Sequence, residues 1–390
     1  MQNNYDMDYV SQNTPMYLFD IFKVQDRINY LREKLPTAKI CYAVKANTFI
    51  AGRIADMADR LEICSSGEYY ICEKLGIAPE KYVISGVKKE KDFIDQTVSS
   101  NEKVGCYTVE SQLHFEMLFN AAKKTGRKLN LLLRLTSGNQ FGMEESEIEQ
   151  LISENKDSEF IKIIGIQYFS GTQKTSVKKL KRELEYVDGF LAKLQEDLGF
   201  VCEELEYGPG LPAMYFEEDY FEEEAYLETF HELLGNLKFQ GEVILELGRG
   251  LAACCGTYFT KVVDKKTNKK ENYAITDGGM HQLVYYGQFM AMKHPKMSVF
   301  PKRDGETKEW NLCGSLCTAN DLFVKKLPVA NLEIGDIFAF ENTGAYCQIE
   351  GISLFLSRDL PTIVLREPDG NYTKVRERFE TFELNLPQDS

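Results

Sequence analysis

The stretch Ile40-Cys41-Tyr42-Ala43-Val44-Lys45-Ala46-Asn47 places a lysine directly after a short apolar run. Such a run predicts a buried strand, so Lys45 is expected where the strand ends and a loop begins. An amine that is partly removed from water loses some preference for its charged form and becomes a usable nucleophile toward an aldehyde. The alternative is a lysine that only extends its ammonium group into solvent from a strand end. The rest of the chain has to decide between the two.

The first apolar run belongs to a series of eight, and helical patterns such as residues 110–124 and 177–198 separate its members. The eight runs are Ile40–Val44, Leu61–Cys64, Tyr82–Ser85, Val104–Thr108, Leu129–Leu135, Ile163–Tyr168, Cys202–Tyr207 and Glu242–Leu247. Eight strand–helix units within about 230 residues predict an α/β fold, a parallel (β/α)8 TIM barrel with its active site at the C-terminal strand ends. A doubly wound open sheet is the alternative, but it requires a glycine fingerprint where Lys45 stands.

Both ends of the chain depart from this rhythm. Met16–Asp20 predicts a short strand before the barrel. After the eighth run, the strand-like segment Ala252–Asp264 leads into the Lys-rich stretch Lys265–Lys270, which predicts an exposed hairpin turn. We therefore expect a barrel over residues 20–249 and a β-sandwich or β-barrel domain over residues 250–390, joined by the N-terminal strand within residues 1–19.

Charge and cysteine usage exclude several classes of function. The chain has 46 Lys and Arg against 60 Asp and Glu, a net charge of −14, which disfavours nucleic acid and anionic membranes as partners. The polar start Met1–Gln12 lacks the features of a signal peptide and no run could cross a membrane, so a cytoplasmic location is expected. The ten cysteines fit free thiols, and the spacing of Cys313 and Cys317 does not favour zinc, so we expect no metal.

The string YAVKAN at residues 42–47 resembles the cofactor-lysine motif of the fold-type III pyridoxal phosphate (PLP) enzymes. This group includes alanine racemase, ornithine decarboxylase and diaminopimelate decarboxylase. The resemblance implies that PLP, pyridoxal 5'-phosphate, is the cofactor and that Lys45 holds it as a Schiff base. Further motifs follow in the family's order from Met16 to about Phe355, so the resemblance covers nearly the whole chain.

Three of these motifs concern the cofactor. Glu246-Leu247-Gly248-Arg249 resembles the family's Glu-Pro-Gly-Arg, which implies that Glu246 lies beside the pyridine nitrogen and Arg249 at the phosphate. Tyr207-Gly208-Pro209-Gly210 resembles the Gly-Gly-Gly phosphate turn, although Pro209 offers no N–H. Phe169 occupies the position of a histidine that stacks on the ring; it can stack but cannot exchange protons.

The C-terminal half resembles the decarboxylases of this family in three further segments, which are Asp277–Met280, Cys313–Asp321 and Glu341–Tyr346. The resemblance implies that Cys317 and Asp321 reach the active site of a partner subunit and that Tyr346 contacts the phosphate. The expected assembly is a homodimer with shared active sites. Cys317 could be a buried structural thiol, but its place beside Asp321 favours a proton donor.

Departures from the family pattern concern the substrate. Diaminopimelate decarboxylases carry an arginine shortly after Gly-Gly-Met and an acid directly after the cysteine. This chain has His281–Gly287 and Thr318 at those places, so a free distal carboxylate lacks an obvious partner. The pattern resembles the sub-branch that acts on larger or carrier-bound amino acids, such as carrier-tethered glutamate or siderophore precursors. We expect His281, Thr318 and Asp321 at the substrate, with a buried core position as an equal alternative for His281.

The sequence therefore predicts a PLP-dependent decarboxylase of a small-molecule amino acid or a carrier-tethered aminoacyl substrate. Cys317 would return a proton to the substrate after carbon dioxide leaves. A PLP-dependent racemase is one alternative, and Glu246 disfavours it because that branch places an arginine against the ring nitrogen. A homologue that binds PLP without catalysis is the other alternative.

Overall fold

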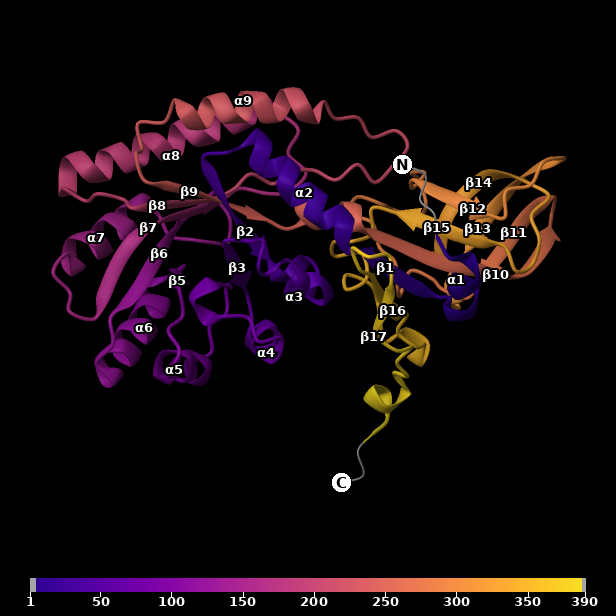
Figure 1. The fold of residues 1–390 in the computed structure, drawn as a ribbon, viewed down its shortest axis with the longest axis horizontal. Coiled ribbons are helices and arrows are strands. Elements are labelled where there is room, and N and C mark those ends of the chain that lie inside the picture. Colours follow the sequence, from indigo (N-terminus) through magenta and orange to yellow (C-terminus); the bar gives the residue numbers. More distant parts are fainter. Residues whose placement is uncertain (1–4, 388–390) are drawn as a thin grey trace. The chain divides into compact units, whose positions relative to one another are not determined.

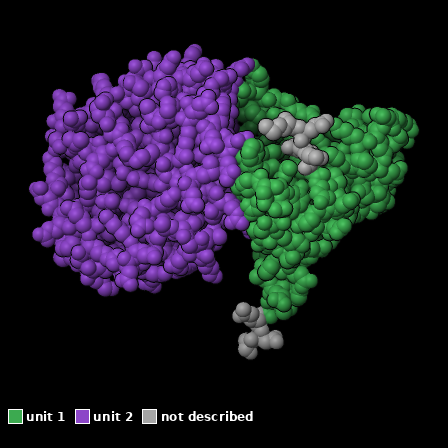
Figure 2. Space-filling model, in the orientation of Figure 1, with its two compact units in different colours: residues 1–24, 213–221, 252–390 green, residues 25–212, 222–251 purple. Residues whose placement is uncertain are grey.

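The computed structural model describes residues 5–387, which divide into two compact units coloured in Figure 2. Unit 1 comprises the described parts of residues 1–24, 213–221 and 252–390, and unit 2 comprises residues 25–212 and 222–251. The first four residues of the predicted polar start Met1–Gln12 and the last three of the expected C-terminal domain lie outside the described range. The limits expected for the two domains, 20–249 and 250–390, stay a prediction.

Unit 2 is a closed barrel of eight parallel strands, so the predicted TIM barrel is confirmed (Figure 1). The strands are β2 (Ala38–Ala43), β3 (Arg60–Ile63), β4 (Tyr82–Ile84), β5 (Cys106–Val109), β6 (Leu129–Leu135), β7 (Ile161–Phe169), β8 (Glu204–Gly208) and β9 (Glu242–Leu247). β2 pairs with β3 on one side and with β9 on the other, which closes the ring. Every predicted apolar run overlaps one of these strands.

Helices follow the barrel strands and surround the ring (Figure 1). They are α2 (Ile21–Lys34), which begins in unit 1, and α3 (Ala51–Ile54), α4 (Ser66–Lys74), α5 (Lys91–Ser99), α6 (Gln112–Thr125), α7 (Glu145–Asn155), α8 (Val177–Leu198), α9 (Glu223–Gly235) and α10 (Arg249–Ala252). Local residues set their ends: Ser65, Ser111 and Ser176 each accept a hydrogen bond from a first-turn N–H. Gly126 and Gly199 end α6 and α8 in the left-handed conformation.

Unit 1 contains a nine-stranded sheet and the short helix α1 (Met7–Asn13). Its strands are β1 (Met16–Asp20), β10 (Gly256–Asn268), β11 (Glu271–Thr276), β12 (Met297–Phe300), β13 (Thr307–Cys313), β14 (Leu322–Ala330), β15 (Ile337–Glu341), β16 (Thr362–Arg366) and β17 (Tyr372–Arg376). The N-terminal strand β1 pairs with β10 and β16, as a strand shared with the C-terminal part should. The expected β-rich second domain is therefore confirmed.

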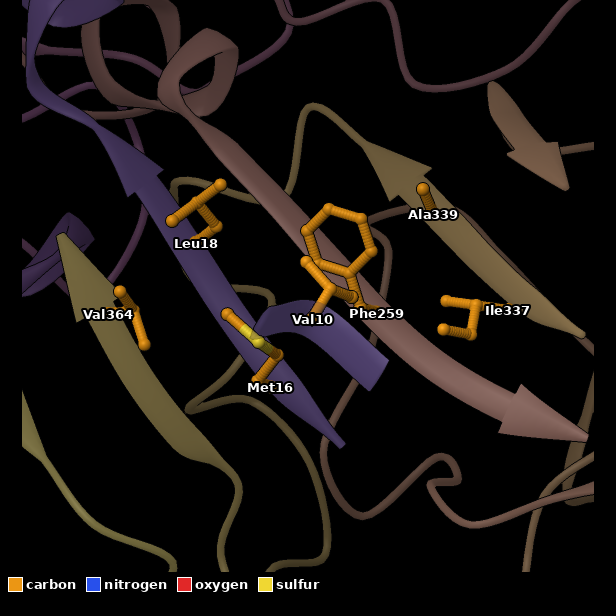
Figure 3. Packing of buried hydrophobic residues seen from close by; sticks show 7 residues of the cluster. All are labelled: Val10, Met16, Leu18, Phe259, Ile337, Ala339 and Val364. Carbon is orange, nitrogen blue, oxygen red and sulfur yellow. The ribbon is translucent and has the colours of Figure 1, made fainter. Parts of the chain in front are cut away.

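A hydrophobic cluster joins distant parts of the unit 1 sequence (Figure 3). Val10 of α1 packs with Met16 and Leu18 of β1, and Phe259 of β10 packs in the same cluster. Ile337, Ala339 and Val364 complete it from β15 and β16. Asp6 caps the N-terminus of helix α1, where its side chain accepts a hydrogen bond from the Tyr9 N–H. The cluster thus explains why a polar N-terminal stretch folds as a helix: Val10 supplies its buried contact.

The predicted hairpin turn Lys265–Lys270 is wrong in its limits. Strand β10 continues to Asn268, and the turn consists of Lys269 and Lys270 alone, with φ of 48° and 72°. The lysines before the turn are strand residues on an exposed hairpin, where long charged side chains remain in solvent. The strand also begins at Gly256 rather than Ala252 because α10 and a single 3₁₀ turn occupy residues 249–255.

No helix within residues 5–387 combines the length and the apolar character needed to span a bilayer.

Candidate active site

Lys45 lies directly beyond the C-terminal end of β2, in the single 3₁₀ turn Val44–Ala46. Its Nζ donates to Glu62 Oε2 and lies 3.4 Å from Glu246 Oε1 and 3.5 Å from Cys64 Sγ. The Lys45 side chain is 35% exposed, whereas the Glu62 side chain is 2% exposed. The amine is thus reachable at the barrel mouth while two buried carboxylates hold it in place.

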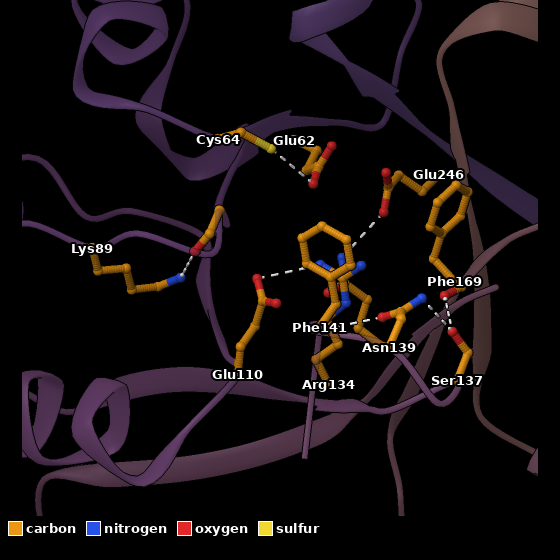
Figure 4. Close-up of polar contacts among 12 residues, drawn as sticks. Glu62, Cys64, Lys89, Glu110, Arg134, Ser137, Asn139, Phe141, Phe169 and Glu246 are labelled. Carbon is orange, nitrogen blue, oxygen red and sulfur yellow. Dashed lines mark hydrogen bonds and ion pairs between the residues drawn. The ribbon is translucent and has the colours of Figure 1, made fainter. Parts of the chain in front are cut away.

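The strand register accounts for this grouping. Ala43 of β2 is the Cα partner of Glu62 on β3, and Cys41 of β2 is the partner of Glu246 on β9. The two glutamates therefore flank β2 from either side at the level where Lys45 begins its loop. In Figure 4, Cys64 points toward Glu62, and the Sγ donates to Glu62 Oε1 at 3.1 Å.

Glu62 and Glu246 differ in pKa, because both are removed from water but the charges near them have different effects. Burial, followed by the negative charge of Glu62, raises the pKa of Glu246 to about 7. Burial alone would raise the pKa of Glu62 as well, but the Lys45 ammonium lowers it to about 2. Glu62 is thus the ionised partner of Lys45, and Glu246 is the carboxyl group that gains or loses a proton near neutral pH.

A second layer of polar groups lies behind Glu246. Gln167 of β7 donates from Nε2 to Glu246 Oε2 at 3.1 Å and to Glu206 Oε1 of β8 at 2.9 Å. Glu206 is completely buried. Burial, with the negative charges of Glu246 and Glu62, raises the pKa of Glu206 to about 8. Glu206 is therefore mostly protonated at pH 7.

The turn after β8 packs tightly against the loop after β7. A Cβ on Gly208 would lie 2.4 Å from Phe169 Cδ2, and a Cβ on Gly210 would lie 2.1 Å from the carbonyl oxygen of Gly171. Gly210 also has a φ of 62°, which favours glycine. Arg249 is buried, and its Nε donates to Thr172 Oγ1 of the same loop at 3.4 Å. The structure thus brings together Phe169, Gly208, Gly210 and Arg249.

The remaining predicted residues belong to unit 1. Asp321 is buried and its two carboxylate oxygens each accept a backbone N–H at 2.7 Å, from Met280 and Leu316. A Cβ on Gly279 would lie 2.7 Å from Asp321 Oδ2 and 2.9 Å from His281 Nδ1, so these side chains surround the Gly-Gly-Met turn. The Asp321 carboxylate thus holds two loops together.

His281 is 1% exposed, and its Nδ1 has no hydrogen-bond partner within residues 5–387. Burial and the nearby Arg358 lower the pKa of His281 to about 4, so the ring is neutral. Cys317 is an exposed free thiol, and the half-buried Thr318 accepts a hydrogen bond from the Asn320 N–H. Tyr346 has a φ of 65° in the loop after β15. The roles expected for these residues stay predictions.

Sequence reasoning missed Glu62, Gln167 and Glu206 as site residues. The signal was present, because Glu62 and Glu206 are acids inside otherwise apolar strands, the same pattern that distinguishes Glu246. It also missed a group on the neighbouring strand ends, shown in Figure 4. There Arg134 Nη1 of β6 lies 3.2 Å from Glu110 Oε1, and the buried Lys89 donates to the Gly86 carbonyl at 2.9 Å.

Within residues 5–387 no three His, Cys, Asp or Glu side chains form a metal-binding group.

Known proteins resemble this chain over most of its length. It is 26% identical to the L-glutamyl-[BtrI acyl-carrier protein] decarboxylase of Niallia circulans, covering 94% of this chain and 91% of that protein. It is 27% identical to the diaminopimelate decarboxylase of Aquifex aeolicus, covering 85% of this chain and 82% of that protein.

The fold also matches a solved structure. The diaminopimelate decarboxylase of Helicobacter pylori, complexed with L-lysine, superimposes with a TM-score of 0.84 at 24% identity, covering 98% of both chains. The family model for the pyridoxal-binding domain of pyridoxal-dependent decarboxylases matches residues 22–253. With its lysine and paired carboxylates at the end of a matching barrel, the chain belongs to the pyridoxal-dependent decarboxylases.

Proposed function

We propose that the reaction takes place around Lys45, where the chain removes the carboxyl group of an α-amino acid with PLP as cofactor. The observation that carries this assignment is the contact of the Lys45 amine with Glu62 and Glu246 at the C-terminal strand ends of the barrel. Active sites of (β/α)8 barrels lie at this end. The chain is a PLP-dependent carboxy-lyase by family.

The residues present fit the cofactor in three respects. The amine of Lys45 is reachable and has acidic neighbours that can exchange protons with it. Glu246 has a side chain only 10% exposed and is a carboxyl group of the kind that can hold a proton at a pyridine nitrogen. The Gly208–Gly210 turn leaves no room for a Cβ at either glycine, and the buried Arg249 lies beside the loop that this turn packs against. Together they supply an amine, an acid and an anion site.

Lys45 would hold the cofactor through its aldehyde. Pyridoxal phosphate, when bound, supplies an electron-poor ring that accepts the electron pair released as carbon dioxide leaves. Glu246 would keep a proton at the ring nitrogen, since its carboxyl group titrates near neutral pH. Glu62 would orient the Lys45 amine through their ion pair. Gln167 would fix Glu246 by donating to its second oxygen.

The phosphate would be held by Arg249, Gly208, Gly210 and Tyr346. Phe169 would stack on the ring, because an aromatic face offers dispersion contact without exchanging protons. After carbon dioxide leaves, the Sγ–H of Cys317 would return a proton to the substrate carbon.

We also propose that the substrate is a larger or carrier-bound amino acid. Support comes from the Niallia circulans relative, which is named for a carrier-protein-bound glutamyl substrate, and from Thr318 and His281 at positions that lack the acid and the arginine expected for diaminopimelate. Thr318, His281 and Asp321 would shape the substrate pocket. Measurement of kcat/KM for free L-glutamate, glutamyl-S-pantetheine and meso-diaminopimelate tests this proposal. A clear preference for diaminopimelate would contradict it.

A decarboxylase and a racemase differ in their products, so one pair of assays separates them. The PLP-loaded protein should release carbon dioxide from its substrate, and L-amino acids that it does not decarboxylate should keep their optical rotation. Lys45→Met should abolish both carbon dioxide release and the visible absorbance of covalently held cofactor. If wild-type protein binds PLP but releases no carbon dioxide from any tested amino acid, the chain is a non-catalytic homologue.

We propose a homodimer as the working assembly. Support comes from an exposed apolar patch in unit 1, formed by two segments that Asn385 links through hydrogen bonds to the Leu354 carbonyl and Ser357 Oγ. The patch contains Ile352, Leu354, Phe355, Leu356, Phe382, Leu384 and Leu386, each at least 41% exposed. Apolar patches of this kind mark protein–protein interfaces. Sedimentation velocity at micromolar concentration would detect a dimer.

A cytoplasmic location is also proposed, supported by ten free cysteines.

A further inference from the structure

Lys174 is a buried lysine that the proposed reaction does not use. It lies in the loop between β7 and α8, and its side chain is 4% exposed. Burying an ammonium group is costly unless every proton finds an acceptor. The three protons of Lys174 Nζ have three acceptors: Glu183 Oε2 at 2.7 Å, Ser170 Oγ at 3.1 Å and the Gly208 carbonyl at 3.3 Å.

Glu183 of α8 is the counter-ion of this lysine and is itself buried. Besides Lys174, it accepts hydrogen bonds from Ser170 Oγ at 2.5 Å and from Tyr207 Oη at 2.8 Å. Burial alone would raise the pKa of Glu183, but the hydrogen bonds from Lys174 and Ser170 lower it below its ordinary value. The pair is therefore ionised, fully hydrogen-bonded and fixed to the end of β8 through Tyr207.

Lys174 also controls both ends of the Gly208–Gly210 turn. Its Nζ binds the carbonyl of Gly208, and its backbone N–H donates to the carbonyl of Gly210 at 2.9 Å. Both carbonyl oxygens, which would repel an anion, are thus engaged by one residue. The N–H of Gly210 makes no hydrogen bond within residues 5–387 and remains available as a donor.

The loop that carries Lys174 is held in an unusual conformation. Gly171 has a φ of 138°, and Gln173, directly before Lys174, has a φ of 55°. A Cβ on Gly210 would lie 2.8 Å from Lys174 Cε, so the turn rests on the aliphatic part of this lysine. Without the amine, the Gly208 carbonyl would lose the donor that fixes its direction, and only the backbone bond from Lys174 to the Gly210 carbonyl would remain.

We propose that Lys174, with Glu183 as its counter-ion, is a positioning residue that aligns the Gly208–Gly210 turn for the cofactor phosphate. The inference rests on the proposed phosphate site. Lys174 acts without touching the anion: it binds the turn's carbonyl oxygens and leaves the Gly210 N–H to the phosphate. Pro209 has no N–H to donate to the phosphate, so the turn depends on the direction that Lys174 gives to its other groups.

The test compares two ligands that differ only in the phosphate. Apoprotein is titrated with PLP and with pyridoxal, and both dissociation constants are measured by absorbance and fluorescence, without any assay of turnover. Lys174→Met should lower the preference for PLP over pyridoxal about tenfold or more, the loss expected for one charge-assisted contact. Pyridoxal affinity should stay within about twofold of wild type.

The double variant Lys174→Met/Glu183→Gln separates alignment from the damage of an unpaired buried charge, because both of its side chains are neutral. We expect it to fold even if the single variant does not, and to retain the loss of PLP preference. Lys162→Met, which removes an exposed lysine of strand β7 that pairs with Glu203, is the matched control and should behave as wild type. A double variant with wild-type preference for PLP would overturn the inference, as would equal weakening of both ligands. If wild-type protein itself does not prefer PLP to pyridoxal, the proposed phosphate site fails instead.

Discussion

Glu62 and Glu206 are buried in the barrel, the Glu246 side chain is 10% exposed, and Lys45 contacts Glu62 and Glu246. Three carboxylates cannot all ionise in this space, because burial and mutual repulsion both favour the protonated form. The lysine selects Glu62 as the ionised one, and the other two keep protons to higher pH. This arrangement leaves Glu246 with a proton affinity that suits contact with a pyridine nitrogen.

Glu246→Gln should lower kcat about a hundredfold, because an amide cannot keep the ring nitrogen protonated, a loss comparable to that of other single electrostatic groups in active sites. The dissociation constant for PLP should change far less, since Lys45 and the phosphate site remain. Steady-state kinetics with a saturating substrate and a PLP titration measure both quantities.

Glu242→Gln is the control for this prediction. It lies on the same strand β9 and removes an exposed carboxylate paired with Lys39. It should leave kcat unchanged. Full kcat in Glu246→Gln would mean that another group faces the ring nitrogen.

Glu206 makes the stability of the apoprotein depend on pH in a defined direction. Its pKa is about 8 in the folded protein against an ordinary 4.5, so the folded state binds the proton more tightly than the unfolded chain. Stability therefore falls as pH rises from about 4.5 to about 8 and stays low above that range. Glu206→Gln cannot ionise and should raise the thermal midpoint of apoprotein by about 5 °C at pH 9, with almost no change at pH 4.5.

Differential scanning calorimetry of apoprotein at both pH values checks this prediction. Glu203→Gln, an exposed neighbour three residues earlier in sequence, is the control and should give no such difference between the two pH values. Equal midpoints for wild type and Glu206→Gln at pH 9 would show that ionisation of Glu206 does not lower the stability of the folded protein.

Single site residues can be predicted from the sequence where a local pattern marks them. Lys45 and Glu246 are found because each closes an apolar run, and the family motif names their chemistry. Lys174 and Glu183 are not found, because a lysine in a loop and a glutamate in a helix are ordinary solvent-exposed residues by pattern. Only the close packing of two loops removes them from water.

The hairpin between β10 and β11 shows that sequence composition can locate a turn without giving its exact limits. The lysines predicted a turn, yet strand pairing continues to Asn268, which faces Glu271. The two turn residues, Lys269 and Lys270, both have positive φ, the signature of a type I′ turn. Lysine is a poor residue for that conformation, so composition located the hairpin but not its ends. By contrast, β1 and α8 were predicted to the residue because strong caps and breakers bound them.

Lys269→Asn/Lys270→Gly should stabilise unit 1 by about 1 kcal/mol, because Asn-Gly adopts the type I′ turn with little strain. The thermal midpoint of apoprotein measures the gain. Lys266→Gly, at a strand position opposite Tyr273, is the matched control and should destabilise the protein by about 1 kcal/mol. A double variant less stable than wild type would show that the lysine side chains themselves stabilise the turn.

The molecule as a whole combines elements that no local pattern connects. Residues 213–221 join unit 1 through backbone pairs with residues 294–296, such as Glu217 N–H to the His294 carbonyl at 2.9 Å. Such long-range pairing has no signal in the composition of either segment. The two-part architecture was predictable because eight strand–helix units and a β-rich remainder differ in period, whereas one chain does not show whether subunits share active sites.

The proposed sharing of active sites between subunits can be tested by mixing two inactive proteins. Lys45→Met removes the cofactor lysine, and Cys317→Ala removes the proposed proton donor. If each site combines Lys45 of one protomer with Cys317 of its partner, random exchange gives half heterodimers, each with one intact site. The mixture should recover about one quarter of wild-type activity. If both residues act within one protomer, every site keeps one defect and mixing restores nothing. Wild-type protein mixed with Cys317→Ala controls for loss of activity during mixing, because its activity should equal the mean of the two homodimers under either arrangement.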